Sequence, residues 1–239
     1  MPTANTPTTI KVISFDLDDT LWPLADTLAK AEEAYYQWLC ERCPEVAEHT
    51  IESLRQQRRE YLLDHPQHQH QISQLRVEAT QQLLHGYGYD DAKAISEEGF
   101  KHFIQWRNAV TPYPDTKTVL AQLSETYRLI AITNGNVDLQ QTELAGYFDF
   151  CLSAEQLNAS KPMPEPFQIA RHRCAVNDNE IAHVGDHIEH DIKGASNQGW
   201  RTIWLDHGHC EQGDIQPDAI INDIAQLPAA ISALNNTAI

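Results

Sequence analysis

The chain has few basic residues: 17 Lys and Arg stand against 34 Asp and Glu, so that the net charge is −17 with histidine neutral. Proteins whose main partner is a nucleic acid or an anionic membrane need clustered Lys and Arg, so we expect neither partner here. A small anionic substrate stays open, because a metal ion, one lysine and oriented backbone N–H groups can supply positive charge locally.

Long apolar runs are missing too, and none approaches the length that a bilayer-spanning helix needs. The first nine residues are polar and unlike a signal peptide. Cysteines are few, odd in number and widely scattered, which is typical of free thiols in a reducing compartment. They are Cys40, Cys43, Cys151, Cys174 and Cys210. We therefore expect a cytoplasmic protein.

Two different patterns divide the chain of 239 residues. Between about residues 24 and 107 apolar residues recur only at helical spacing. After Pro114 helical segments alternate with short apolar, β-branched runs. The expected strands are 10–15, 129–132, 148–152, 181–184, 200–205 and 219–221. The expected helices are 29–38, 51–63, 72–84, 94–106, 115–123, 137–144, 166–174, 191–197 and 224–234. Asp115 is placed to cap the helix that follows it.

Strands alternating with helices predict an α/β fold with a doubly wound, parallel, Rossmann-like sheet. We expect this core to comprise residues 10–21 and 110–239. Residues 22–109 then form an all-helical domain inserted over the catalytic edge of the sheet, and residues 1–9 a disordered tail.

The stretch Phe15-Asp16-Leu17-Asp18-Asp19-Thr20-Leu21 directly follows the first expected strand. Ligands of open α/β sheets bind at the carboxyl ends of the strands. Three carboxylates gathered there repel one another unless a cation or protons hold them. An acidic N-cap explains Asp18, Asp19 and Thr20, but not Asp16 at the strand end. We interpret the stretch as a hard-metal site with a carboxylate nucleophile beside it.

Three further signals fall at the ends of later strands. They are Thr133-Asn134-Gly135, Ser160-Lys161-Pro162, and Gly185-Asp186 followed by Asp191. Each alone has an ordinary explanation as a turn, a solvated lysine or an acidic helix start. All of them in order, at successive strand ends, indicate one site.

Together these motifs resemble the haloacid dehalogenase (HAD) superfamily, which places a helical cap between its first and second motifs. Four segments look most like its bacterial flavin mononucleotide (FMN) phosphatase group: the Phe15–Leu21 stretch, Trp106-Arg107, Ile132–Asn136 and His183–Asp186. The resemblance implies a hydrolase that cleaves a small phosphorylated metabolite, with FMN, or failing that another aromatic nucleotide, as the candidate substrate.

The resemblance also implies the roles of the first two acids. Asp16 is the nucleophile and forms an aspartyl-phosphate by in-line attack. Asp18 protonates the leaving alcohol and then deprotonates the attacking water.

The remaining motif residues are implied to bind. Mg²⁺ is expected on the carboxylates of Asp16 and Asp186 and the backbone carbonyl of Asp18. Thr133 and the Asn134 N–H hold phosphoryl oxygens, and Lys161 neutralises their charge. Asp191 positions Lys161 or a metal-bound water from behind.

Several other activities share this motif set or fold. Within the family they are nucleoside monophosphate phosphatase, phosphoglycolate phosphatase, phosphomutase and 2-haloacid dehalogenase. Halide needs no protonation and the haloacid needs no Mg²⁺, so Asp18 and Asp186 argue for phosphate. A phospho-acceptor signalling module, the non-enzyme alternative, has no use for Asp18 or for a cap. We expect a monomer.

Some residues outside the motifs have open roles. Trp22, six residues past the nucleophile, is expected to stack on an aromatic leaving group. The arginines at 55, 58 and 59 are expected to form a solvated face, although contact with a substrate or a partner is the alternative. His187 and His190 are expected to be exposed polar residues, with added metal affinity as the alternative. His183 is expected in the core.

Overall fold

A computed structural model describes residues 9–208 and 212–236. The expected tail, apart from Thr9, and Cys210 lie outside the described residues. The chain forms two compact units. One comprises Met1–Pro23, Pro112–Gly135 and Glu143–Ile239, and the other Leu24–Thr111 and Asn136–Thr142.

The α/β unit contains a six-stranded, all-parallel sheet with the strand order β3-β2-β1-β4-β5-β6. Its strands are β1 (Val12–Phe15), β2 (Arg128–Thr133), β3 (Phe150–Ser153), β4 (Ile181–Gly185), β5 (Arg201–Leu205) and β6 (Ala219–Ile221). Phe15 pairs with Ala131 on one side and Val184 on the other. The predicted doubly wound sheet is confirmed, with β1 at its centre.

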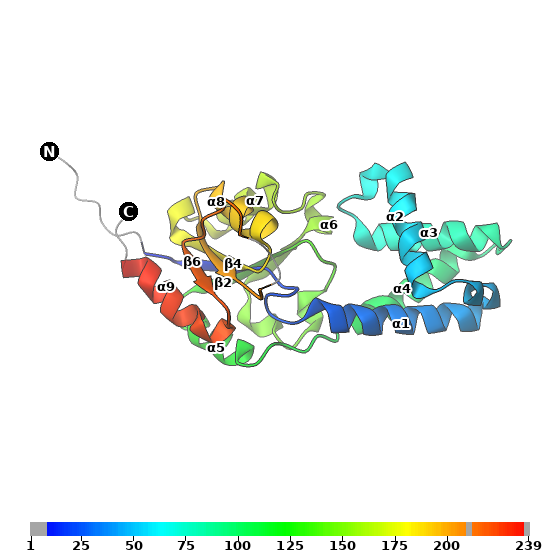
Figure 1. Cartoon of the computed structure of the whole chain (residues 1–239), viewed down its shortest axis with the longest axis horizontal. Coiled ribbons are helices and arrows are strands. Elements are labelled where there is room, and N and C mark those ends of the chain that lie inside the picture. The colour runs from blue at the N-terminus through cyan, green and yellow to red at the C-terminus, as the bar shows by residue number, and fades with distance from the viewer. Residues whose placement is uncertain (1–8, 209–211, 237–239) are drawn as a thin grey trace. The chain divides into compact units, whose positions relative to one another are not determined.

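Helices flank this sheet: α5 (Thr116–Ser124), α6 (Ala154–Leu157), α7 (Pro164–Cys174), α8 (Gly194–Ser196) and α9 (Leu227–Asn236) (Figure 1). Buried apolar residues of β2, β3 and β4 pack against α7 in one cluster that includes Ile130, Phe150, Phe167 and Trp200. The strands read as continuous apolar runs because helices cover both faces of a parallel sheet.

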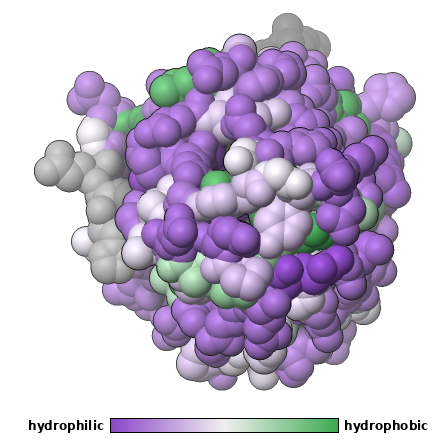
Figure 2. All heavy atoms as spheres, turned by 90° about the vertical axis from the view of Figure 1, so that its right-hand side faces the viewer, coloured by the Kyte–Doolittle hydropathy of each residue, from purple (hydrophilic) through white to green (hydrophobic). Residues whose placement is uncertain are grey.

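The second unit contains the helices α1 (Leu24–Arg42), α2 (Ile51–Asp64), α3 (Ile72–Gly86) and α4 (Ala92–Arg107). Its apolar core includes Tyr35, Leu39, Ile95 and Phe103. A Cβ at Gly99 would lie 2.8 Å from the Trp38 ring, so α1 and α4 can pack this closely only with glycine there. The molecular face shown in Figure 2 is largely hydrophilic, as expected where apolar side chains point inward.

A buried ion cluster joins three of these helices. Glu32 on α1 has a side chain only 4% exposed. It accepts hydrogen bonds from Arg55 Nε at 2.7 Å, Arg58 Nη2 at 2.7 Å and Arg76 Nη2 at 3.4 Å. The Arg76 guanidinium lies 3.8 Å from the centre of the Phe103 ring. The expected solvated arginine face is therefore wrong for Arg58, whose side chain is 16% exposed.

Charge and burial compete in this cluster. Burial alone would raise the pKa of Glu32, but the hydrogen bond from Arg55 and the charges of Arg76 and Arg58 outweigh it and lower that pKa. Burial, with the nearby Arg58, lowers the pKa of Arg76 to about 10. The Nη1 atom of Arg76 is buried and has no hydrogen-bond partner among the described residues.

Residues 136–142 belong to the helical unit although they follow the motif at the end of β2. Asn136 Nδ2 donates to Ser73 Oγ at 3.1 Å, and the Asp138 N–H donates to Asn108 Oδ1 at 2.9 Å. The helix expected over 137–144 is wrong: only short 3₁₀ turns form, at Leu139–Gln141 and Ala145–Tyr147. The Asn136 side chain and the Asp138 backbone N–H bond to the helical unit instead of taking part in a helix.

Two other local expectations also differ. Asp115 lies at the N-cap of α5 but makes no side-chain capping bond, because its φ of 63° places it in the left-handed region. The helix expected over 191–197 instead begins as a π-helix at Ile188–Lys193 and continues into α8.

The four described cysteines are free thiols. No helix among the described residues combines the length and the apolar character that crossing a membrane requires.

Candidate active site

The candidate site lies where the strand order of the sheet reverses. β1 is flanked by β2 and β4. After β2 the chain adds β3 on one side of the sheet, and after β4 it adds β5 on the other side. Asp16 directly follows β1, Thr133 ends β2 and Asp186 directly follows β4. Such a switch point opens a crevice outside the carboxyl ends of the strands. The sheet topology therefore brings three sequence-predicted motifs to one edge.

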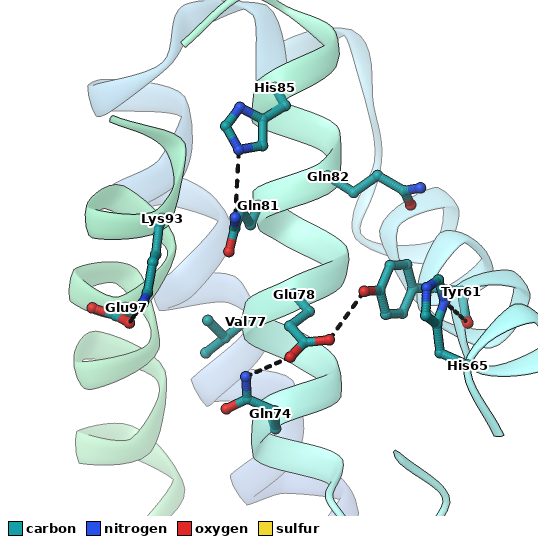
Figure 3. Close-up of a pocket in the computed structure, with 10 residues that line it drawn as sticks. All are labelled: Tyr61, His65, Gln74, Val77, Glu78, Gln81, Gln82, His85, Lys93 and Glu97. Atoms are coloured by element: carbon teal, nitrogen blue, oxygen red, sulfur yellow. Dashed lines mark hydrogen bonds and ion pairs between the residues drawn. The ribbon is translucent and has the colours of Figure 1, made fainter. Parts of the chain in front are cut away.

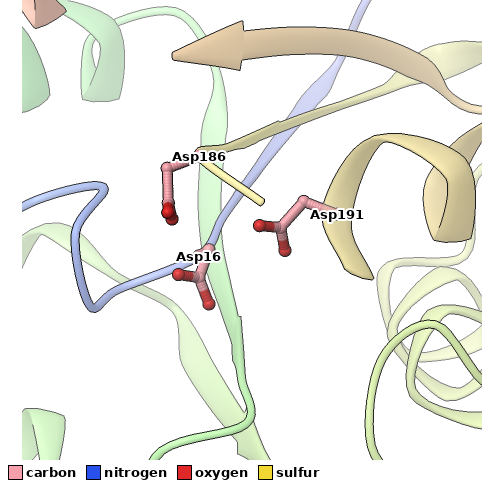
Figure 4. Close-up of side chains that lie close together, drawn as sticks. All are labelled: Asp16, Asp186 and Asp191. Carbon is pink, nitrogen blue, oxygen red and sulfur yellow. The ribbon is translucent and has the colours of Figure 1, made fainter. Parts of the chain in front are cut away.

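Three carboxylates converge there: oxygens of Asp16, Asp186 and Asp191 lie within 4.8 Å of one another (Figure 4). Burial raises the pKa of Asp16 well above its ordinary value, and Asp191 and Asp186 push it further against the attraction of Lys161. Burial and then Asp191 raise the pKa of Asp186 to about 6. Crowded, desolvated oxygens of this kind are the donor set that Mg²⁺ prefers.

Lys161 joins two of these acids. Its Nζ lies 2.5 Å from Asp16 Oδ1 and 2.5 Å from Asp191 Oδ1, and all three residues are buried. Burial opposes the charge on Lys161, but the two carboxylates outweigh it and raise the pKa of the ammonium group. Lys161 therefore stays protonated beside the expected nucleophile.

Asn134 fixes the loop that carries Lys161. Its side-chain Oδ1 accepts from the Lys161 N–H at 2.8 Å, and its Nδ2 donates to the Lys161 carbonyl at 2.9 Å. Thr133, buried at the end of β2, accepts a hydrogen bond from the Gly135 N–H at 2.9 Å. The Asn134 amide thus acts on the position of Lys161, which the sequence motif did not indicate.

Asp18 and Trp22 lie in the loop that follows the nucleophile. The Trp22 indole N–H donates to Asp18 Oδ1 at 2.9 Å, and the Trp22 side chain is completely buried. The ring therefore offers no exposed face, and the expectation that a substrate stacks on Trp22 is wrong in this structure. Packing around the loop buries the ring, and sequence spacing cannot reveal that.

Three residues of the motifs or next to them, to which sequence reasoning gave no role in the site, act on its carboxylates. Thr20 Oγ1 donates to Asp186 Oδ1 at 3.0 Å. His183, expected as a core residue, is buried, but its Nε2 lies 3.2 Å from Asp191 Oδ1. A Cβ at Gly185 would lie 2.3 Å from Asp191 Cγ, so only glycine lets that carboxylate approach.

The two histidines after Asp186 stack on each other, with ring centres 3.8 Å apart. His187 Nδ1 accepts from the N–H groups of Glu189 and His190, while the His187 N–H donates to Asp191 Oδ2 at 3.0 Å. The Nδ1 atom is thus engaged in the turn. His187 contributes to the site by orienting Asp191 through its backbone.

The helical unit has a separate polar pocket of about 480 Å³ between Tyr61 and His65 of the α2 end, Glu78 of α3 and Glu97 of α4 (Figure 3). His65 stacks on Tyr61, whose hydroxyl donates to Glu78 at 3.0 Å. All of its lining residues belong to the helical unit, so it is distinct from the carboxylate site.

Comparison with known proteins gives the family. Residues 10–199 match the model of the haloacid dehalogenase-like hydrolases. The chain is 28% identical over 208 residues to 5-amino-6-(5-phospho-D-ribitylamino)uracil phosphatase YigB of Escherichia coli K12, with 86% of each protein covered. It is 31% identical over 209 residues to the glyceraldehyde 3-phosphate phosphatase of Pyrococcus abyssi, covering 83% of this chain and 82% of that protein.

A solved structure points in a second direction. The crystal structure of 2-haloacid dehalogenase from Pseudomonas syringae pv. Tomato DC3000 superposes with a TM-score of 0.89 and 38% identity, over 94% of this chain and 99% of that chain. Phosphatases and dehalogenases thus both occur among its relatives. On the match over residues 10–199, the chain belongs to the haloacid dehalogenase-like hydrolase family.

Proposed function

We propose that the protein is a Mg²⁺-dependent phosphatase that hydrolyses a small phosphate monoester through an aspartyl-phosphate on Asp16. The observation that carries the proposal is the convergence of Asp16, Asp186 and Lys161 at one sheet edge, with Asp18 two residues beyond the nucleophile. Relatives named as phosphatases support it.

Asp16 attacks the phosphorus in line, and the bond from phosphorus to the leaving oxygen breaks. Asp18 donates a proton to that oxygen, so the alcohol departs neutral. In the second step Asp18 takes a proton from water, whose oxygen attacks the phosphorus. The Asp16 carboxylate is released together with inorganic phosphate, so that each residue returns to its starting state.

The Lys161 ammonium group lies 2.5 Å from Asp16, so it favours the ionised carboxylate against the effect of burial and orients it before the reaction. Asp191 holds the other side of this ammonium group and is itself held by His183 and the His187 N–H. A preorganised positive charge then faces the phosphoryl oxygens, which Thr133 and the Asn134 N–H bind in this proposal.

The carboxylates of Asp16 and Asp186, with the Asp18 carbonyl, would hold Mg²⁺. Bound there, the cation supplies charge that offsets the repulsion between the carboxylates and the phosphate. Asp191 is not placed in this set because Lys161, His183 and the His187 N–H already occupy its oxygens.

For the substrate we propose a ribityl phosphate that carries a heteroaromatic ring. The motif resemblance favours FMN, and the name of the Escherichia coli relative describes a phosphoribitylamino uracil, which has the same kind of phosphorylated chain. The buried ring of Trp22 removes stacking on that residue as an argument, so the preference depends on similarity alone.

Dehalogenation of a 2-haloacid is the second candidate, since the Pseudomonas structure carries that name. Such a reaction needs the nucleophile but neither a proton donor for the leaving group nor a cation. Asp186, whose carboxylate lies among the other acids with Thr20 bonded to it, has no role in that chemistry.

One paired assay separates the candidates. Purified protein is given a panel of phosphate esters that includes FMN, with and without Mg²⁺, and in parallel 2-chloropropionate with halide detection. We expect phosphate release that EDTA abolishes and excess Mg²⁺ restores, with no halide. Release of halide without phosphate would refute the proposal.

A further inference from the structure

Trp22, at the end of the loop that follows the nucleophile, contacts Asp18. Its indole Nε1–H donates to Asp18 Oδ1 at 2.9 Å. The backbones meet as well, because Asp18 and Trp22 form an isolated parallel bridge and the Asp19 N–H donates to the Trp22 carbonyl at 2.8 Å. One residue thus contacts Asp18 through both its side chain and its main chain.

The indole is held firmly in this position. Its side chain is 0% exposed, and the loop is fixed at its middle by the Leu21 N–H, which donates to the Leu17 carbonyl at 2.8 Å. The Tyr113 N–H donates in turn to the Leu21 carbonyl at 2.9 Å. A donor that is already immobilised can orient a carboxyl group without a further loss of conformational entropy.

The chemistry of indole restricts what Asp18 can do. An indole nitrogen donates a hydrogen bond and cannot accept one. The oxygen that faces it has to accept this hydrogen bond whether Asp18 is ionised or protonated. A carbonyl oxygen accepts better than a hydroxyl oxygen, so the contact favours Oδ2 as the atom that carries the carboxyl proton. Because the indole N–H does not ionise near neutral pH, Asp18 alone gives and takes the catalytic proton.

We propose that Trp22 is a positioning residue, whose indole N–H fixes the Asp18 carboxyl group so that Oδ2 gives and takes the catalytic proton. The inference rests on the proposed phosphatase function, in which Asp18 is acid and base. It replaces substrate stacking as the role of this tryptophan.

The test removes the N–H and keeps the ring. In Trp22→β-(3-benzothienyl)alanine, sulfur takes the place of the N–H in a ring system of the same shape, and Trp22→Phe is the simpler companion. For each, kcat/KM is measured with 4-nitrophenyl phosphate, whose leaving group needs little protonation, and with an alkyl phosphate that the wild type hydrolyses. General acid catalysis contributes about 10²- to 10⁴-fold in all, so a misplaced acid should cost the alkyl phosphate roughly ten- to a hundredfold.

Trp200→Phe is the matched control. Its indole is also buried and donates to an aspartate, Asp178 Oδ1, at 3.4 Å in the same unit. We expect this variant to keep the wild-type ratio of alkyl to aryl kcat/KM, while both Trp22 variants lower it through kcat with little change in KM.

Equal losses on the two substrates, or an unchanged ratio in the benzothienyl variant, would overturn the inference and leave the phosphatase function intact. If Trp22→Phe unfolds, as a thermal melt would reveal, the benzothienyl variant decides. Wild-type protein that releases no phosphate in Mg²⁺ would instead remove the proposed function, and the inference with it.

Discussion

Replacing Glu32 by glutamine is expected to destabilise the helical unit by about 3–5 kcal/mol, the usual cost of removing one partner from a buried ion pair. Glutamine keeps the shape of the side chain but removes the negative charge that faces Arg55, Arg58 and Arg76. The loss of this charge should affect Arg76 most. Its guanidinium is buried against Phe103, and its Nη1 already lacks a described partner.

The assay is thermal unfolding, combined with hydrogen exchange of the individual helices. At about 2–4 °C per kcal/mol for a chain of this length, the melting temperature should fall by about 6–20 °C if the chain unfolds as one. If the helical unit opens alone, exchange in α1, α2 and α3 should become faster, and the opening free energy calculated from it should fall by about the same 3–5 kcal/mol. β1 and β4 should then stay protected.

Glu52→Gln is the matched control, because Glu52 also accepts from two arginines, Arg55 and Arg59, but has a side chain 63% exposed. Solvent screens that pair, so the control should melt like the wild type. Equal shifts in the two variants would refute the reasoning from burial.

The pH dependence has a defined sign. The folded pKa of Glu32 lies below its ordinary value of 4.5, so its stabilisation is complete above that pH and disappears as the pH falls through the lowered pKa. The difference in unfolding free energy between the wild type and Glu32→Gln should therefore be constant near neutral pH and shrink below about 4.5. A difference that grows on acidification would contradict the lowered pKa.

Three further substitutions test the catalytic edge. Asp16→Asn should retain its fold and lose turnover, since an amide cannot form the acyl-phosphate; a tenth of the wild-type rate in a phosphate-release assay would exclude covalent catalysis. Asp18→Asn should preserve Mg²⁺ binding, measured by calorimetry, and should harm an alkyl phosphate far more than an aryl phosphate. Equal harm, with chemistry rate-limiting in both, would remove Asp18 from the acid role. Gly185→Ala should lower kcat strongly because its Cβ would lie 2.3 Å from Asp191 Cγ, and full activity would show that the Asp191 contact is dispensable.

The sheet and the main site could be predicted because their signals are local. A parallel strand covered by helices reads as a continuous apolar run, and polar residues directly after such runs must gather at one edge. Asp16, Thr133 and Asp186 follow this rule. The order of the strands then places them together without any knowledge of side-chain packing.

Contacts between distant residues could not be read in the same way. Arg58 pairs with Glu32 across 26 positions, and His183 on β4 contacts Asp191, which lies in a π-helix. Nothing in the spacing of Trp22 distinguishes a ring free to bind a substrate from one buried under its own loop. Side-chain environment, rather than element type, decides these roles.

The segment Asn136–Thr142 determines which residues must be exchanged when the helical unit is replaced. A simple insertion would be exchanged by cutting the chain twice, at Pro23 and at Thr111. Asn136 is hydrogen-bonded to Ser73, and Asp138 to Asn108. If the helical unit alone were replaced by that of a relative, this connector, residues 136–142, would lose the partners for which its sequence is suited. A working chimera therefore has to exchange the connector too, through two additional junctions, one before Asn136 and one after Thr142. Variation of the helical unit is for this reason tied to a segment that begins two residues beyond Asn134, an expected phosphate-binding residue.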